Sequence, residues 1–240
     1  MLEYNAPIRA RKLPERYRNP ADVPQRIPVF PLCRAILLPR ATLPLNIFEP
    51  RYLQMVDDAM STSRVLGMVQ PASSGEDEEE HESPVSRTAP LRRIGCAGRI
   101  TSYQELDDGR LLISLSGIAR FEVVDEVELA KPYRVCTVRY ERFVGDFTPG
   151  AGEDQVDREA LLGALKAFLQ SRGLKADWAA VSKTPTEALV NSLAMVNPYG
   201  SEEKQALIEA ADLKTRADML VALAEMDIKA GSRGPGSTLQ

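Results

Sequence analysis

Strand-like and helix-like sequence patterns occupy different parts of this 240-residue chain. Up to residue 145, short apolar segments rich in Val, Ile and Leu are separated by prolines and tight turns, which is typical of antiparallel strands. From residue 146 onwards, apolar residues recur at helical spacing. Strands followed by helices favour an α+β fold over a doubly wound parallel sheet.

The clearest strand signal surrounds Asp107-Asp108-Gly109. Two alternating segments, 94–106 and 110–115, flank this tripeptide, and Asp-Gly supplies the positive φ that a tight hairpin turn requires. Further strands are predicted at 119–124 and 133–140. Several closely spaced strands joined by tight turns predict an antiparallel barrel or sandwich.

Composition shifts along the chain predict four regions. They are an extended N-terminal arm (1–26), a β subdomain (27–145) that contains an acidic loop (71–90), a helical subdomain (146–229) and a disordered tail (230–240). The arm is polar and rich in proline, the loop holds six acidic residues within 76–82, and the tail is rich in Gly and Ser.

The residues needed for common catalytic and metal sites are missing or badly placed. The single histidine, His81, lies in the acidic run, where nothing would hold it rigidly enough for a triad. The three cysteines are far apart and form no C-x-x-C pair. The chain also has no Walker-type phosphate loop, no dinucleotide-binding glycine motif and no nucleophile elbow. We therefore expect no enzyme activity, no metal and no cofactor.

Charge and hydropathy limit the possible surroundings and partners. No apolar run approaches the ~18 residues of a membrane span, and the N-terminus lacks the apolar core of a signal peptide. We therefore expect a cytoplasmic protein with no membrane partner. The formal net charge is −4, so the chain is not a polycation built for nucleic acid.

Several segments carry motifs of a known family. The segments 27–32, 43–52, 94–100 and 108–121 contain P-L-x-I-F-E-P-R-Y and, later, L-x-G-x-A-R. Together with the helical stretch 189–228, they resemble the N-terminal, substrate-binding domain of the ATP-dependent Lon protease. The resemblance implies a PUA-like β-barrel followed by a helical bundle, and contact with unfolded or partly folded polypeptides. Because the sequence stops at Gln240, we expect a stand-alone module without the ATPase and Ser-Lys peptidase parts, which a protease or ATPase partner would supply.

Exposed apolar side chains near the P-L-x-I-F-E-P-R-Y motif would suit a surface that accepts many sequences, because apolar contact is not directional. The candidate peptide-binding residues are Leu37, Leu38, Pro39, Leu43, Pro44, Phe48, Tyr52 and Met55. The alternative interpretation is that these side chains form barrel core. Glu49, Pro50 and Arg51 are expected at a helix start and in a salt bridge. A second functional hypothesis is an RNA-binding PUA-like module, since the barrel region carries many arginines, although the acidic loop argues against it.

Overall fold

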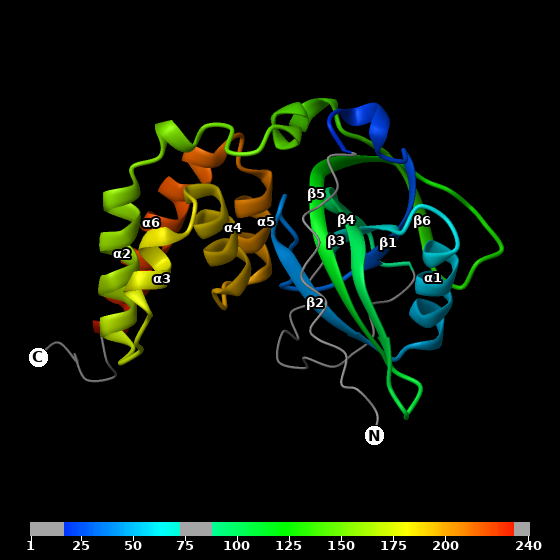
Figure 1. Cartoon of the computed structure of the whole chain (residues 1–240), viewed down its shortest axis with the longest axis horizontal. Helices are drawn as coiled ribbons and strands as arrows, with labels where there is room; N and C mark the ends of the chain where they lie inside the picture. The colour runs from blue at the N-terminus through cyan, green and yellow to red at the C-terminus, as the bar shows by residue number, and fades with distance from the viewer. Residues whose placement is uncertain (1–16, 73–87, 233–240) are drawn as a thin grey trace, which may run out of the picture. The chain divides into compact units, whose positions relative to one another are not determined.

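The computed structural model describes residues 17–72 and 88–232 (Figure 1). The chain divides into two units, Met1–Thr148 and Pro149–Gln240. The predictions made for residues 1–16, for the acidic run with His81 and for residues 233–240 lie outside the described residues.

Six strands and one α-helix build the first unit. In chain order the elements are η1 (Pro20–Asp22), β1 (Arg26–Pro31), β2 (Thr42–Ile47), α1 (Pro50–Met60), β3 (Val65–Pro71), β4 (Leu91–Glu105), β5 (Leu111–Glu126), β6 (Arg134–Arg139) and η2 (Glu141–Phe147). The sheet order is β2-β5-β4-β3-β1-β6, and a further pairing between β5 and β6 closes the sheet on itself. The predicted barrel and the α+β class are confirmed.

One strand pair differs from the antiparallel arrangement expected from the sequence. β1 and β3 pair in parallel, with Val29 opposite Gly67, whereas the other five pairings are antiparallel. Between these two strands the chain passes through β2 and α1, and a parallel pair requires a long crossover of this kind. The barrel is therefore mixed.

The predicted hairpin is present between β4 and β5. Gly109 adopts a φ of 82°, and its N–H donates to the carbonyl oxygen of Leu106 over 2.9 Å. The segments 110–115 and 119–124, expected as two strands, belong, except for Arg110, to the single long strand β5. Residues 17–26, expected as an extended arm, instead fold onto the barrel, because Val23 is buried and the Tyr140 hydroxyl donates to the carbonyl of Pro24 over 2.9 Å.

The barrel core is built around Phe121 on β5. A Cβ atom on Gly95 would lie 2.6 Å from this ring, and one on Gly67 would lie 3.0 Å from it. Both glycines therefore make room for the aromatic side chain, which accounts for glycines inside strands that would otherwise favour larger residues. The neighbouring core residues include Ile27, Val29, Val65, Val69, Ala97, Ala119, Cys136, Val138 and Tyr140.

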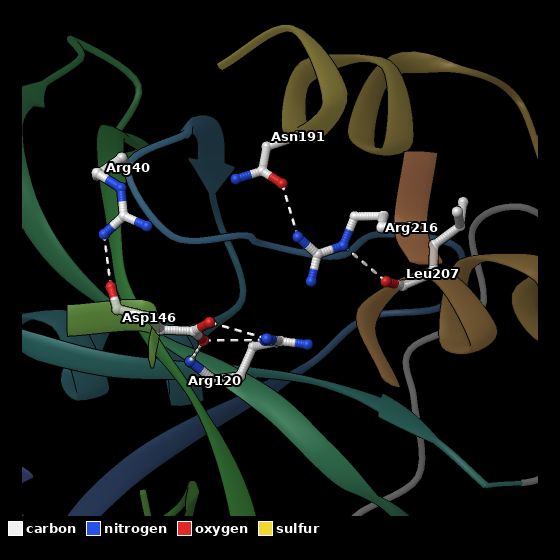
Figure 2. Close-up of polar contacts among 6 residues, drawn as sticks. All are labelled: Arg40, Arg120, Asp146, Asn191, Leu207 and Arg216. Carbon is white, nitrogen blue, oxygen red and sulfur yellow. Dashed lines mark hydrogen bonds and ion pairs between the residues drawn. The ribbon is translucent and has the colours of Figure 1, made fainter. Parts of the chain in front are cut away.

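A buried ion pair joins η2 to β5 (Figure 2). The Asp146 carboxylate accepts from the backbone N–H and the Nε of Arg120, each over 2.9 Å, and from its Nη2 over 2.8 Å. The Arg120 guanidinium also lies 4.3 Å from the centre of the Phe143 ring, and Arg40 donates to the carbonyl oxygen of Asp146. Asp146, expected at the start of a linker, is thus a buried anchor of the first unit.

The second unit is helical. It contains η3 (Glu153–Gln155), α2 (Arg158–Ser171), α3 (Trp178–Lys183), α4 (Thr186–Val196), α5 (Ser201–Glu209) and α6 (Leu213–Ser232). The short helix α3 was not predicted from the sequence. Residues 230–232, assigned to a disordered tail, are helical because α6 continues through Ser232. No helix in the described part of the chain is both long and apolar enough to span a bilayer.

Two buried cations tie the helices of the second unit together. Lys204 on α5 donates from Nζ to the carbonyl oxygens of Ala194 and Met195, over 2.8 and 2.6 Å, at the end of α4. It thereby satisfies carbonyls that a helix end leaves without intrahelical partners. Arg216 on α6 donates to Asn191 Oδ1 over 2.8 Å and to the carbonyl oxygen of Leu207 over 2.9 Å, and both contacts are drawn in Figure 2. Burial lowers the pKa of Lys204 to about 8.

Candidate functional site

The eight predicted peptide-binding residues fall into two groups in the structure. Leu37, Leu38, Pro39, Tyr52 and Met55 are buried. Buried side chains have little surface with which to contact a peptide in this conformation. These five residues therefore fit the alternative interpretation, in which they form part of the barrel core. Leu43 is half-buried, while Pro44 and Phe48 are exposed, and these three carry the proposal forward.

A close approach between distant segments explains the burial of Leu37 and Leu38. A Cβ atom on Gly98 would lie 2.5 Å from Cδ2 of Leu37, and one on Gly117 would lie 2.0 Å from the carbonyl oxygen of Leu38. Gly117 is the glycine of the L-x-G-x-A-R motif. The signal available in the sequence was a glycine inside a strand pattern, which indicates that another backbone comes close.

The start of α1 explains the burial of Tyr52. Pro50 occupies the first turn of the helix, and Arg51 forms a salt bridge of 2.8 Å with Glu49, which confirms the expected helix-start roles. The Tyr52 ring lies 4.2 Å from that of Phe30, centre to centre, and the Arg51 guanidinium lies 4.5 Å from the Tyr52 ring. Arg51 and Tyr52 of the motif therefore help to pack the start of α1 against the barrel.

Phe48 stands at the end of β2, where the chain turns into α1. Its exposed fraction is 63%, which is high for a phenylalanine, a residue type that is usually buried. On β5, the exposed Leu112 lies opposite Asn46 of β2. Together with Pro44, these side chains form an exposed apolar surface, here called the β2 surface: Pro44, Phe48 and Leu112.

Within the described residues, β2 and the neighbouring parts of β5 and β4 carry no charge, although Glu49 follows Phe48 and Glu105 pairs with Leu111. The residues of β2, of β5 from 111 to 116 and of β4 from 100 to 104 include no Asp, Glu, Lys or Arg. The nearest described ion pairs, Arg51 with Glu49 and Arg110 with Asp108, lie just beyond these ends. Such a surface favours apolar and backbone contacts and does not select a ligand by charge.

Arginines of the first unit are engaged in internal contacts. Arg120 pairs with Asp146, Arg134 with Glu126, Arg110 with Asp108, and both Arg93 and Arg139 with Glu122, while Arg99 donates to Tyr17 and Ser63 and Arg142 stacks on Phe143. The pairs of Arg93, Arg110 and Arg139 lie at the surface, where an ion pair contributes little, whereas Arg120 and Arg134 are buried in theirs.

A concave region of about 350 Å³ lies beside the end of α1. There, Asp58 accepts hydrogen bonds from Lys131 and Tyr133, and these contacts lower the pKa of Asp58.

The described residues hold no group of three or more His, Cys, Asp or Glu side chains able to bind a metal ion. Burial raises the pKa of the Cys136 thiol to about 11, so this thiol is a weak nucleophile at neutral pH.

Known proteins resemble this chain in sequence and in fold. The family model of the ATP-dependent protease La (LON) substrate-binding domain matches residues 26–225. A Lon protease from Syntrophus aciditrophicus is 25% identical over 201 residues, which cover 81% of this chain and 24% of that protein. Lon protease 2 from Myxococcus xanthus is 27% identical over 212 residues, covering 85% and 24%. The chain spans about a quarter of the length of the curated relatives it matches.

Two solved structures share the fold. The Lon N-terminal domain protein from Xanthomonas campestris has a TM-score of 0.56 at 22% identity, covering 82% of this chain and 97% of that one. The N-terminal domain of the Lon protease from the Mycobacterium avium complex has a TM-score of 0.59 at 16% identity, covering 83% and 98%. Both likenesses therefore include the barrel and the helical unit.

Proposed function

The chain belongs to the family of Lon substrate-binding domains, and from this premise we propose that it is a non-enzymatic module that binds unfolded or partly folded polypeptides. In this proposal it acts as an adaptor or chaperone-like factor in protein quality control. A protease or ATPase partner would then act on the bound polypeptide.

The exposure of Phe48 is the observation that carries this proposal. An aromatic side chain that is 63% exposed loses favourable burial unless a partner covers it. An apolar partner fits this side chain, because the preceding strand β2 carries no charged residue and the adjacent Glu49 is paired with Arg51. Unfolded polypeptides expose such apolar side chains, whereas folded proteins bury most of theirs.

A titration with a fluorescent, permanently unfolded polypeptide tests this function. We expect saturable binding, measured by fluorescence anisotropy, that persists in high salt because apolar contacts are not screened. Absence of binding at high micromolar protein concentration would contradict the proposal. A single-stranded RNA of similar length serves as the comparison ligand.

The salt dependence separates the two functional hypotheses. RNA binding releases counterions, so its affinity should fall steeply between low and high salt. If the protein bound the RNA in this salt-sensitive way and left the polypeptide unbound, the RNA-binding alternative would replace the proposal.

A further inference from the structure

The edge of β2 that faces away from β5 gives the proposed function a binding mode. We propose that an extended segment of the client polypeptide adds to β2 as an extra strand, with apolar residues at alternate positions. This inference rests on the proposed function and specifies how the polypeptide is held.

The hydrogen-bond register shows which backbone groups of β2 are available. Leu106 N–H donates to the Arg110 carbonyl over 2.9 Å. Because hydrogen-bonded pairs alternate along an antiparallel ladder, the backbone N–H and carbonyl groups of Leu112 and Ser114 on β5 point towards β4. The intervening residues of β5, namely 111, 113 and 115, are left to bond with β2, where they pair with residues 47, 45 and 43.

The backbone N–H and carbonyl groups of the other β2 residues, at positions 42, 44 and 46, consequently point away from β5. Thr42 and Asn46 each present an N–H and a carbonyl to the open side, and Pro44 presents a carbonyl only. The β2 strand stands at the end of the sheet order, and among the described residues no backbone group forms a hydrogen bond on this side. Carbonyl acceptors at positions 42, 44 and 46, with N–H donors at 42 and 46, can pair with the backbone of one extended polypeptide.

The start of β2 supports the same register independently. Gly117 N–H donates to the Ala41 carbonyl over 2.9 Å, so position 41 faces β5 and position 42 faces away. Pro44 thereby falls on the open side, where its missing N–H removes no bond to β5. Proline is tolerated in a strand at this kind of position.

The β2 edge lacks most of the features that stop edge strands from pairing. Such strands usually carry lysine or other charges, and β2 carries none. On its inner face, Leu43 and Leu45 are only half-buried, although their neighbours Ile113 and Leu115 on β5 are buried. An added strand with apolar residues at alternate positions would cover these two leucines. The exposed faces of Pro44 and Phe48 would meet the side chains of its other face.

Peptides with methylated backbone nitrogens test the hydrogen-bonding edge without changing the protein. The probe is an extended peptide of alternating Val and Thr with lysines at its ends, prepared unmodified, methylated at every second nitrogen and methylated at all nitrogens. An added strand needs one intact edge, so we expect the half-methylated peptide to bind and the fully methylated one to bind at least about tenfold more weakly. Equal affinity of all three peptides would overturn strand addition.

A substitution on the open side of β2 tests the same edge from the protein. The N–H of Asn46 takes no part in the ladder with β5, so Asn46→Pro should remove only the open-side donor, as Pro44 already does. We expect Asn46→Pro to weaken peptide binding about tenfold and Asn46→Ala to leave it nearly unchanged, with unaltered circular dichroism in both. Equal binding by the two variants would overturn the proposal.

These outcomes separate this inference from the proposed function. If the unfolded polypeptide binds but methylation and Asn46→Pro have no effect, polypeptide binding stands and strand addition fails. If no polypeptide binds, the proposed function fails as well. A concentration-dependent dimer that Asn46→Pro abolishes would show that a second copy of the chain occupies the edge, and would also overturn the proposal.

Discussion

Replacing Asp146 with alanine should destabilise the first unit strongly. The Asp146 carboxylate holds three N–H groups of Arg120, whose side chain is 5% exposed. The substitution leaves this guanidinium buried without its counter-charge. Burying an uncompensated charge is far more costly than losing a pair at the surface.

The magnitude follows from the burial of both partners. Breaking a buried pair by removing one member costs about 3–5 kcal/mol. With a urea m-value of about 2 kcal/mol/M, the unfolding midpoint should fall by about 1.5–2.5 M. Arg93, whose side chain is 71% exposed in its pair with Glu122, provides the matched control, since Arg93→Ala should cost less than about 1 kcal/mol.

The assay must report on the first unit alone. Trp178, the only tryptophan of the chain, belongs to the helical unit, so its fluorescence follows that unit. Urea titrations read by hydrogen exchange of β5 peptides follow the barrel. A second variant, Arg120→Met with Asp146→Leu, removes both charges and should recover much of the lost stability. A loss below about 1 kcal/mol for Asp146→Ala would refute the reasoning.

Two further substitutions probe the packing and the pH dependence. Gly117→Ala should destabilise the barrel by about 1–3 kcal/mol or more in urea titrations, because its Cβ would lie 2.0 Å from the Leu38 carbonyl oxygen, whereas Gly145→Ala, with open space around it, should be nearly neutral. Equal effects of these two substitutions would contradict the close approach. Burial lowers the pKa of Lys204 from 10.5 to about 8. At pH values between these two pKa values, Lys204 is therefore protonated more often in the unfolded state than in the folded state. The free energy of unfolding should therefore rise with pH from about 8 to about 10 relative to the Lys204→Met variant, and a constant difference in thermal melts would count against this.

Local sequence signals predicted the elements whose cause is local. Asp108 and Gly109 specify a tight turn within four residues, so the β4–β5 hairpin could be predicted without the rest of the chain. Pro50 and the apolar spacing from Tyr52 similarly identified α1. The parallel pairing of β1 with β3 and the closure of β5 on β6 depend on contacts between distant segments, which no local pattern contains.

The candidate site was harder to predict because exposure is a property of the assembled barrel. Leu38 precedes a proline and Phe48 lies within the P-L-x-I-F-E-P-R-Y motif, and both are apolar, yet Leu38 is fully buried and Phe48 is 63% exposed. What separates them is Gly117, nearly eighty residues from Leu38 in the sequence, which lets the chain approach β5. The buried role of Asp146 likewise depends on Arg120, an arginine in an otherwise apolar stretch of β5.

We expect this chain to bind unfolded polypeptides through the β2 surface. The most direct measurement is the affinity of one permanently unfolded polypeptide for the unmodified protein, for Phe48→Asp and for Leu129→Asp. Leu129 is a 48% exposed leucine of the same unit, outside β2, and serves as the matched control. We predict that Phe48→Asp weakens binding about tenfold or more and that Leu129→Asp leaves it unchanged. Equal affinity of the three folded proteins, or no binding by any of them, would contradict the claim.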